Sequence, residues 1–430
     1  MPEAPMSQTR IEVEVERMAH GGEGVGRDAS GRAVFVDGGL PGERVLVGLD
    51  ETRERHARGR LVAMPDPVAP ERRPGAAPCP HFGAWPERGL APERHCGGCS
   101  WQHVDYSAQL RFKQQALIDS LNRIGGIAEP IVHSTIGMPD PWHYRNHLRL
   151  KAGPAGVGLV AMDGARVLGV QTCHIAHPLV NDLLDQLELE LPEGSEVSLR
   201  AGTATGDQMI VLRADAAALE SIDVESEASV LLIEPDGRIQ LASGRPWLVE
   251  RLEDRDFLVP PGSFFQVNTV MAEQLVACVR RCLPDDGRVL ADIYSGVGTF
   301  TALLADRFEA VLAIESDREA VAAAVDNAAG LDQVTLFEAD AAEGLAHLGD
   351  APDVLLVDPP RGGLSRSLTR LLAQHPAHTI VYVSCEPATL ARDARQLVAA
   401  GWRFVDCQPV DMFPQTYHVE SVSTFSRRAP

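Results

Sequence analysis

From about residue 262 onward, short apolar runs alternate with Ala- and Leu-rich segments, and this alternation constrains the fold more than any other feature of the chain. The apolar runs are RVLADIY, AVLAIES, VTLFEAD, DVLLVDPP and TIVYVSC. Buried strands separated by helices form doubly wound, mostly parallel sheets, because the crossover helices cover both faces of the sheet. We therefore predict a Rossmann-like α/β domain over residues 262–430, with ligands at the C-terminal ends of its strands.

Residues 1–65 have a different sequence pattern, and we predict a small OB-like β-barrel there. The segments RIEVEVERM, RAVFVD and ERVLVGLDE are strand-like, and Gly-rich turns such as HGGEGVG separate them. Short alternating strands with dense turns are typical of such barrels, which often bind single-stranded nucleic acid. A barrel that only supports its neighbours is the alternative interpretation.

A Pro-rich linker, MPDPVAPERRPGAAP, follows the barrel and opens a β-rich central domain that we expect over residues 66–261. This region contains a cysteine segment and strand patterns such as HLRLKA and QMIVLRA. It also contains apolar residues at helical spacing over about 102–125. That helix is a candidate to pack with the C-terminal domain. A multidomain chain agrees with a length of 430 residues.

The net charge of −21 argues at first sight against a nucleic-acid partner, since basic side chains supply most non-specific affinity for phosphates. However, residues 1–151 carry 19 basic and 19 acidic side chains, so the whole excess of acid lies in the remainder. A polyanion should therefore dock on the N-terminal part. No apolar stretch approaches the roughly 18 residues of a membrane span, and the N-terminus has no signal-peptide pattern. We expect a cytoplasmic monomer without membrane contact.

The segment ADIYSGVGTFTALLA indicates a cofactor site, because Gly296 and Gly298 lie between a strand and a helix, where the backbone can pass close to a ligand. Position 301 is Thr instead of the third glycine of the dinucleotide motif, which disfavours a pyrophosphate-bearing cofactor. Acidic residues end the next three strands, at Glu315, Asp340 and Asp358. These suit a ribose, an adenine amine and a sulfonium, so S-adenosylmethionine fits better than NAD. The alternative is that they only form turns.

DPPRGG (358–363) and VSCEPATLARD (383–393) follow consecutive strands and should meet at one sheet edge. Cys385 lies just before a helix that begins near Pro387, where the helix dipole favours a thiolate. A lone cysteine is more often a buried apolar residue, but this position indicates a nucleophile. A thiolate that adds to C6 of uracil makes C5 nucleophilic toward a methyl group. Glu420 is then the predicted general base for the C5 proton, with His418 a structural neighbour.

The motifs DIYSGVGTF, DPPRGG, SCEPATLARD and DMFPQTYHVESV, in this order, resemble those of the RNA uracil-5 methyltransferase family. SFFQVN (263–268) resembles its cofactor- and uracil-side motif, and the N-terminal barrel resembles a TRAM domain. The resemblance implies a class I methyltransferase domain that transfers a methyl group from S-adenosylmethionine to C5 of a uridine, with Cys385 and Glu420 as catalytic residues. It implies cofactor contacts from Gln266, Tyr294, Thr299, Glu315, Asp340 and Asp358. Glu386 stands where the family usually has Asn. If its carboxylate pointed toward the thiol, its negative charge would raise the pKa of Cys385.

Cys96 and Cys99, in CGGC, form a metal-ligand pair, and Cys79 and Cys173 could complete four ligands. Spacing alone does not separate zinc from iron–sulfur. The ribosomal-RNA branch of the family carries a [4Fe-4S] cluster on a similar pattern, so the resemblance implies that cluster here. Sixteen residues separate Cys79 from Cys96, more than the family usually has. The longer loop should be tolerated, because closure costs grow slowly with length.

PWHYRNHLRLK (141–151) mixes aromatic residues with Arg145, Arg149 and Lys151, as RNA-binding surfaces do, and it resembles the family's YRN motif. The TRAM-like barrel and the cysteines favour 23S ribosomal RNA as the substrate. A tRNA T-loop uridine is the alternative target. A non-catalytic RNA-binding protein that keeps the fold is the alternative from another class, and the acidic C-terminal half and Glu386 would support it.

Overall fold

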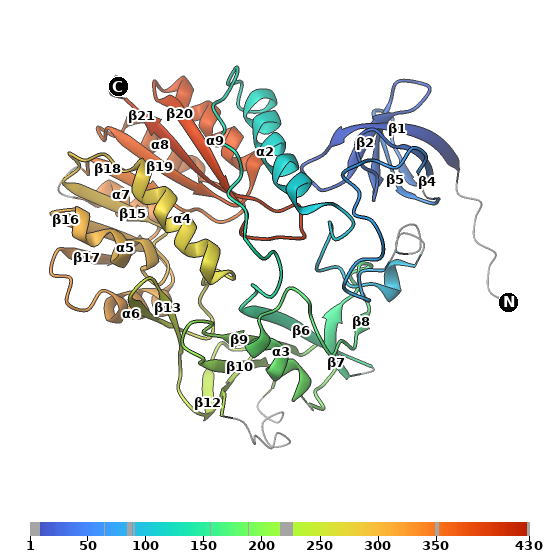
Figure 1. The fold of residues 1–430 in the computed structure, drawn as a ribbon. Helices are drawn as coiled ribbons and strands as arrows, with labels where there is room; N and C mark the ends of the chain where they lie inside the picture. Colours follow the sequence, from blue (N-terminus) through green and yellow to red (C-terminus); the bar gives the residue numbers. More distant parts are fainter. Residues whose placement is uncertain are drawn as a thin grey trace.

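The computed structural model describes residues 9–63, 65–83, 88, 91–154, 156–187, 189–215, 227–348 and 352–427. Part of the long loop between Cys79 and Cys96 lies outside these residues. Figure 1 shows three parts of the molecule: a small barrel, a central sheet and a C-terminal sheet.

The N-terminal strands form a closed barrel, as predicted (Figure 1, blue). Valine and glutamate alternate in the first strand, which buries Val13 and Val15 inside the barrel and leaves the glutamates outside. In the order β1-β2-β3-β5-β4 around the barrel, the strands are β1 (Arg10–Met18), β2 (Gly24–Arg27), β3 (Ala33–Asp37), β5 (His56–Leu61) and β4 (Arg44–Thr52).

Among the described residues, the 3-10 helix η1 (Pro92–Arg94) and the helix α2 (Tyr106–Arg123) follow the barrel. The side chain of Asp105 caps α2 by accepting a hydrogen bond from Ser107 N. Helix α2 packs against a helix and a strand of the C-terminal sheet, and its Leu117 and Leu121 are fully buried in that core. The helix therefore packs residues 106–123 against the C-terminal sheet.

The central sheet has seven strands in the order β12-β11-β10-β9-β6-β7-β8. Helix α3 (Pro178–Asp185) packs against β9 and β10. A separate hairpin, β13 (Leu248–Leu252) and β14 (Arg255–Val259), contacts helices of the C-terminal sheet. The sheet strands are β6 (His147–Gly153), β7 (Gly156–Val160), β8 (Val167–Leu168), β9 (Glu196–Ala201), β10 (Gln208–Arg213), β11 (Ser229–Ile233) and β12 (Ile239–Ser243).

The C-terminal sheet has the order β17-β16-β15-β18-β19-β21-β20, in which β21 runs antiparallel to both neighbours and the other pairs are parallel. Its strands are β15 (Val289–Ile293), β16 (Ala310–Glu315), β17 (Val334–Glu338), β18 (Val354–Val357), β19 (Thr379–Ser384), β20 (Arg403–Val410) and β21 (Glu420–Ser426). The strand order reverses between β15 and β18, which is where doubly wound sheets bind ligands.

Helices cover both faces of this sheet, so alternate residues of each strand enter two different apolar clusters. Leu290 and Val354 pack on the side of α4, α5 and α6, whereas Ala291 and Leu355 pack on the side of α7, α8, α9 and α2. This double burial explains the unbroken apolar runs in the sequence. The helical elements are α4 (Thr269–Cys282), α5 (Thr299–Leu304), η3 (Ala305–Arg307), α6 (Arg318–Asn327), α7 (Ala341–His347), α8 (Arg366–Gln374) and α9 (Pro387–Ala399).

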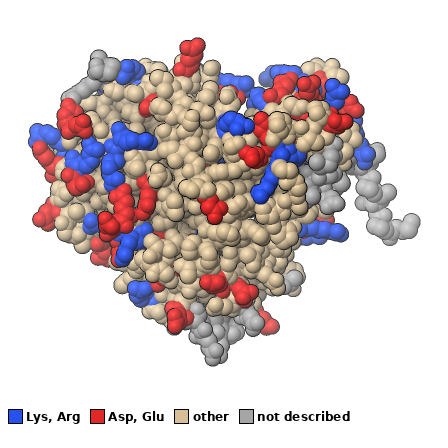
Figure 2. Space-filling model, viewed as in Figure 1, with Lys and Arg blue, Asp and Glu red and all other residues tan. Residues whose placement is uncertain are grey.

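The face seen in Figure 1 carries basic and acidic side chains in mixture over the barrel and the C-terminal domain, with a largely uncharged surface between them (Figure 2). Barrel arginines pair with acids, as in Arg58 with Glu23 and Arg60 with Asp50. The expected preference of a polyanion for the N-terminal part therefore does not show as a basic patch on this face. Among the described helices, none combines the length and apolarity that crossing a membrane requires.

One of the two lysines of the chain is fully buried. Lys113, on α2, donates from Nζ to Oδ1 of Asp411 and to the carbonyl oxygen of Phe413 (3.0 Å). Tyr106 donates its hydroxyl to Oδ2 of Asp411 (2.9 Å). Burial lowers the pKa of Lys113, and the Asp411 charge opposes that shift. These bonds attach α2 to the segment 411–418, which leads into β21.

Replacing Lys113 with Met should leave the Asp411 carboxylate buried without its counter-charge, and this should cost about 3–5 kcal/mol of unfolding free energy. The measurement is urea denaturation of both proteins. Arg288→Gln is the matched control, because it breaks an exposed ion pair with Glu309 and should cost less than about 1 kcal/mol. Equal losses of unfolding free energy in the two variants would show that the buried pair stabilises the fold no more than an exposed pair does.

Candidate active site

The strand register brings the predicted site residues to one edge of the C-terminal sheet. Ile293 pairs with Ile314 of β16 and with Val357 of β18, so Tyr294, Glu315 and Asp358 follow paired positions. Antiparallel pairing of Ser384 with Ser421 then places Cys385, at the end of β19, beside Glu420, at the start of β21. The pairing therefore brings the predicted cofactor residues after β15, β16 and β18 to the same edge as the predicted nucleophile and base.

The loop after β15 has the geometry of a ligand cradle. Tyr294, Gly296 and Gly298 all adopt positive φ (67°, 56° and 83°). A Cβ added at Gly296 would meet no atom within 4 Å, whereas one at Gly298 would lie 3.2 Å from Cβ of Ala324 on the neighbouring helix. The first glycine thus faces open space and the second allows close helix packing.

Buried polar atoms without a hydrogen-bond partner gather near this loop. Within the described part of the chain they include Oδ1 of Asp292, in β15, and Oγ of Ser295, in the loop itself. Burial raises the pKa of Asp292 to about 6, and its Oδ2 accepts from Thr301 (2.6 Å). Such atoms are usually satisfied in proteins, so this edge fits a polar ligand such as S-adenosylmethionine.

The other predicted cofactor residues differ in the contacts that hold them. Glu315 accepts from the backbone N–H groups of Gly296 (3.0 Å) and Asp317 (2.8 Å), which fixes the loop. Asp340 is exposed and caps α7 by accepting from Ala342 N (2.9 Å). Thr299 is the first residue of α5. Gln266 is held through its backbone, because its carbonyl accepts from Nδ2 of Asn146 (2.9 Å).

The reactive pair lies in a crowded, negatively charged environment. Burial, Glu420 and Asp358 raise the pKa of Cys385 to about 12, while Arg361 lowers it. Burial and Asp358 also raise the pKa of Glu420 well above its usual value, again opposed by Arg361. Burial and the nearby Asp292 raise the pKa of Asp358 to about 7. Arg361 is therefore the cation that opposes protonation of both groups.

Glu386 and His418 are neighbours of this pair. The carboxylate of Glu386 points to the barrel, where its Oε1 lies 2.7 Å from Nε2 of His20, and it caps α9 by accepting from Ala388 N. It therefore does not point toward the thiol. His418 packs between Phe413 and Tyr417, and burial lowers its pKa to about 4, so it is neutral.

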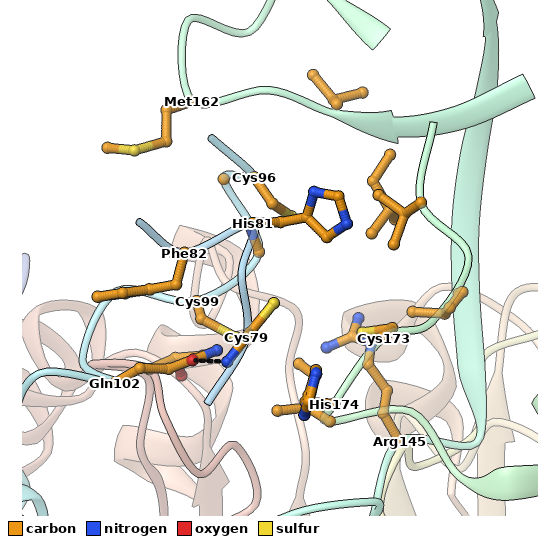
Figure 3. A pocket seen from close by; sticks show the side chains of 18 of the residues that line it. Cys79, His81, Phe82, Cys96, Cys99, Gln102, Arg145, Met162, Cys173 and His174 are labelled. Carbon is orange, nitrogen blue, oxygen red and sulfur yellow. Dashed lines mark hydrogen bonds between the residues drawn. The ribbon is translucent and has the colours of Figure 1, made fainter. Parts of the chain in front are cut away.

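The four predicted metal-binding cysteines line one cavity of about 540 Å³ (Figure 3). Cys79, Cys96 and Cys99 come from one side, and Cys173 comes from the segment between β8 and α3. Gly98 N donates to Sγ of Cys96 (3.3 Å). Within the described residues, however, no three Cys, His, Asp or Glu side chains converge on one metal-ion position. The cavity also reaches Arg361 and His418, so it extends to the catalytic edge.

The predicted RNA-facing segment 141–151 is only partly exposed. Tyr144 is 3% exposed and donates its hydroxyl to the carbonyl of Pro414 (3.0 Å), so its ring is not available to stack on a base. Arg145 and Arg149 line the cysteine cavity. Asn146 holds Gln266, a role that sequence reasoning missed because it depends on a partner 120 residues away.

Comparison with known proteins agrees with these features. The TRAM domain model matches residues 6–62, and the model described as tRNA (Uracil-5-)-methyltransferase matches residues 213–347 and 349–428. An uncharacterised RNA methyltransferase of Caldanaerobacter subterraneus subsp. tengcongensis is 34% identical over 97% of this chain and 98% of its own. One of Halalkalibacterium halodurans is 32% identical over 98% of both chains. This chain belongs to the RNA uracil-5 methyltransferase family.

A solved structure supports the fold of this methyltransferase. The tRNA (uracil-54, C5)-methyltransferase of Pyrococcus abyssi, in complex with S-adenosyl-L-homocysteine, covers 96% of this chain and 100% of its own, with a TM-score of 0.72 and 24% identity. The predicted family and fold class are confirmed, with a TRAM barrel and a C-terminal methyltransferase domain. The chain is an S-adenosylmethionine-dependent RNA methyltransferase.

The charges at this edge predict a pH dependence. With its pKa raised to about 12, Cys385 is a thiolate in only a small fraction of molecules at neutral pH, and that fraction grows as pH rises. The alkylation rate of Cys385, followed by peptide mass spectrometry, should therefore increase steadily between about pH 7 and 9. Arg361→Gln should lower the rate throughout, because it removes the opposing charge, whereas Arg361→Lys should retain it. A plateau within this range, or an unchanged profile in Arg361→Gln, would contradict the assignment.

Proposed function

We propose that this enzyme methylates C5 of a specific uridine in 23S ribosomal RNA through a covalent adduct between Cys385 and C6 of the uracil. The observation that carries the proposal is the antiparallel register of β19 and β21, which sets Cys385 beside Glu420 at the edge that also holds the glycine loop. A nucleophile and a base that lie next to each other beside a methyl-donor site are what C5 methylation requires.

In this proposal, Sγ of Cys385 bonds to C6 of the uracil, and the electron pair of the C5–C6 bond moves toward O4. The carbon C5 then accepts the methyl group that S-adenosylmethionine supplies. Glu420 removes the remaining C5 proton, and the C6–Sγ bond breaks to restore the ring and the thiolate. The raised pKa of Glu420 makes it a stronger base once it is ionised. A uridine within a helix or loop must be flipped out to reach this pair.

The choice of 23S ribosomal RNA rests on the TRAM barrel together with the four cysteines. We assign RNA contacts to the barrel of residues 1–65, the cysteine-bearing central domain to residues 66–261 and methyl transfer to residues 262–430, all within one monomer. Arg145 and Arg149, which line the cavity that reaches Arg361, supply positive charge beside the site. A tRNA T-loop uridine is the second candidate, because the solved relative from Pyrococcus abyssi is a tRNA (uracil-54, C5)-methyltransferase.

We also propose that Cys79, Cys96, Cys99 and Cys173 hold a [4Fe-4S] cluster. The four side chains line one cavity, and backbone N–H groups such as that of Gly98 tune cluster sulfurs. A cluster binds each thiolate to a different iron, so its ligands enclose a larger volume than the four ligands of one zinc ion. The resemblance to the ribosomal-RNA branch of the family favours a cluster over zinc.

Replacing Glu420 with Gln should stop the reaction after methyl transfer, because the C5 proton then has no acceptor. With S-adenosylmethionine and unmodified RNA, this variant should accumulate a protein–RNA adduct that survives denaturing gel electrophoresis. Adding Cys385→Ala to it should abolish the adduct, whereas Cys282→Ser should not. If wild-type protein methylates no uridine and the Glu420→Gln variant forms no adduct, the chain is a non-catalytic RNA-binding protein.

The substrate is tested by offering wild-type protein unmodified 23S ribosomal RNA and unmodified tRNA in the same reaction. Mass mapping of nuclease fragments should locate one or more 5-methyluridines in the ribosomal RNA. Methylation confined to the tRNA T-loop would overturn the ribosomal assignment and leave the chemistry intact.

Protein purified without oxygen should be brown and should contain iron and acid-labile sulfide in equal amounts. Cys99→Ser should lose the colour and the iron, because it removes one ligand of the cluster. Cys282→Ser is the matched control, since Cys282 lies in α4 outside the cavity, and it should keep both. A colourless protein that contains zinc would contradict the cluster.

A further inference from the structure

A turn of the TRAM barrel reaches the catalytic edge. Residues 19–23 connect β1 to β2, and bonds from Ala19 N to Glu23 O (2.7 Å) and from Gly22 N to Ala19 O (3.0 Å) hold the turn closed. His20, within this turn, places Nε2 2.7 Å from Oε1 of Glu386. Because Glu386 directly follows Cys385, the barrel contacts the residue next to the proposed nucleophile.

The same turn touches two more segments. Trp101, two residues after Cys99, donates from Nε1 to the carbonyl oxygen of Gly22 (3.0 Å). Gly22 has a φ of +84°, and a Cβ there would lie 2.8 Å from Cδ1 of Tyr417, so the turn is pressed against the segment that precedes Glu420. The ring of His20 also meets Tyr417 edge to face at 6.0 Å. The turn therefore contacts the nucleophile loop, the segment before the base and the cysteine segment together.

The contact between His20 and Glu386 is partly shielded from water. The two side chains are only 24% and 26% exposed, so solvent screens the pair less than it screens a surface pair. The Glu386 carboxylate also accepts from Ala388 N (3.4 Å), in the first turn of α9. Holding this carboxylate therefore fixes the start of α9 and, with it, the backbone of Cys385.

We propose that His20 is a positioning residue for Cys385: by pairing with Glu386, the barrel holds the nucleophile loop in its reactive geometry and so controls the rate of adduct formation. This inference rests on the proposed role of Cys385. It also accounts for a carboxylate beside the nucleophile, because the barrel imidazole draws that carboxylate away from the thiol.

The test is a double-mutant cycle in the Glu420→Gln background, with the single-turnover rate of adduct formation measured at saturating RNA and methyl donor. His20→Ala and Glu386→Gln should each slow adduct formation about tenfold, and the double variant should be no slower, because all three lose one shared interaction. His20→Gln, which keeps a donor, should recover most of the rate. His133→Ala is the matched control, since it breaks a similar contact with Asp406 (3.0 Å) on β20, and it should leave the rate unchanged.

Additive losses, or an unchanged rate with weaker RNA binding, would show that His20 only docks the barrel. Melting curves check that each variant is folded; if His20→Ala is not, the cycle of His20→Phe with Glu386→Gln decides the question by the same comparison, because Phe keeps a ring beside Tyr417 and removes the nitrogen that contacts Glu386. The Glu420→Gln parent is measured first. If the parent forms no adduct, the proposed role of Cys385 is contradicted, and the inference about His20 is contradicted with it. If the parent forms an adduct, the cycle tests the role of His20 alone.

Discussion

The buried ion pair between Lys113 and Asp411 is the interaction on which the active site depends. A fully buried lysine is costly to desolvate unless its partner is fixed, so the pair stabilises only one arrangement of α2 and the segment 411–418. Other parts of the chain bind the same segment. Ser100 and Trp101 donate backbone N–H groups to the carbonyl of Gln415, Tyr144 donates to the carbonyl of Pro414, and Asn268 donates to the carbonyl of Met412. Because this segment leads directly into β21, its position sets the position of Glu420.

The electrostatics of the sheet edge follow from burying several acids together. Asp292, Asp358 and Glu420 lie in a poorly solvated region, and the charge of each disfavours ionisation of its neighbour. A ligand with a positive charge at this edge would favour the ionised carboxylates, and by linkage the ionised carboxylates would favour that ligand. Binding of a sulfonium donor and ionisation of the proposed base are therefore coupled, which the acidic strand ends alone could not reveal.

Local patterns predicted the fold because both domain types leave a strong signature in the sequence. Strands covered on both faces give apolar runs, and barrel strands give alternation. The strand-end residues Tyr294, Glu315, Asp358 and Cys385 could be grouped because parallel strands end at one edge. The direction of Glu386 could not be predicted, since it depends on His20, which lies far away in the sequence and in another domain. The burial of Tyr144 could not be predicted for the same reason, since its partner at Pro414 lies far along the chain.

An enzyme with a net charge of −21 can still bind RNA if the charges near the RNA differ from the average. Exposed charges farther away than about 8–10 Å are largely screened at physiological salt, so acids on distant helices oppose binding only weakly. Arg145, Arg149 and Arg361 line one cavity that extends from the cysteines to the catalytic edge. These arginines therefore place positive charge close to the acids of the sheet edge.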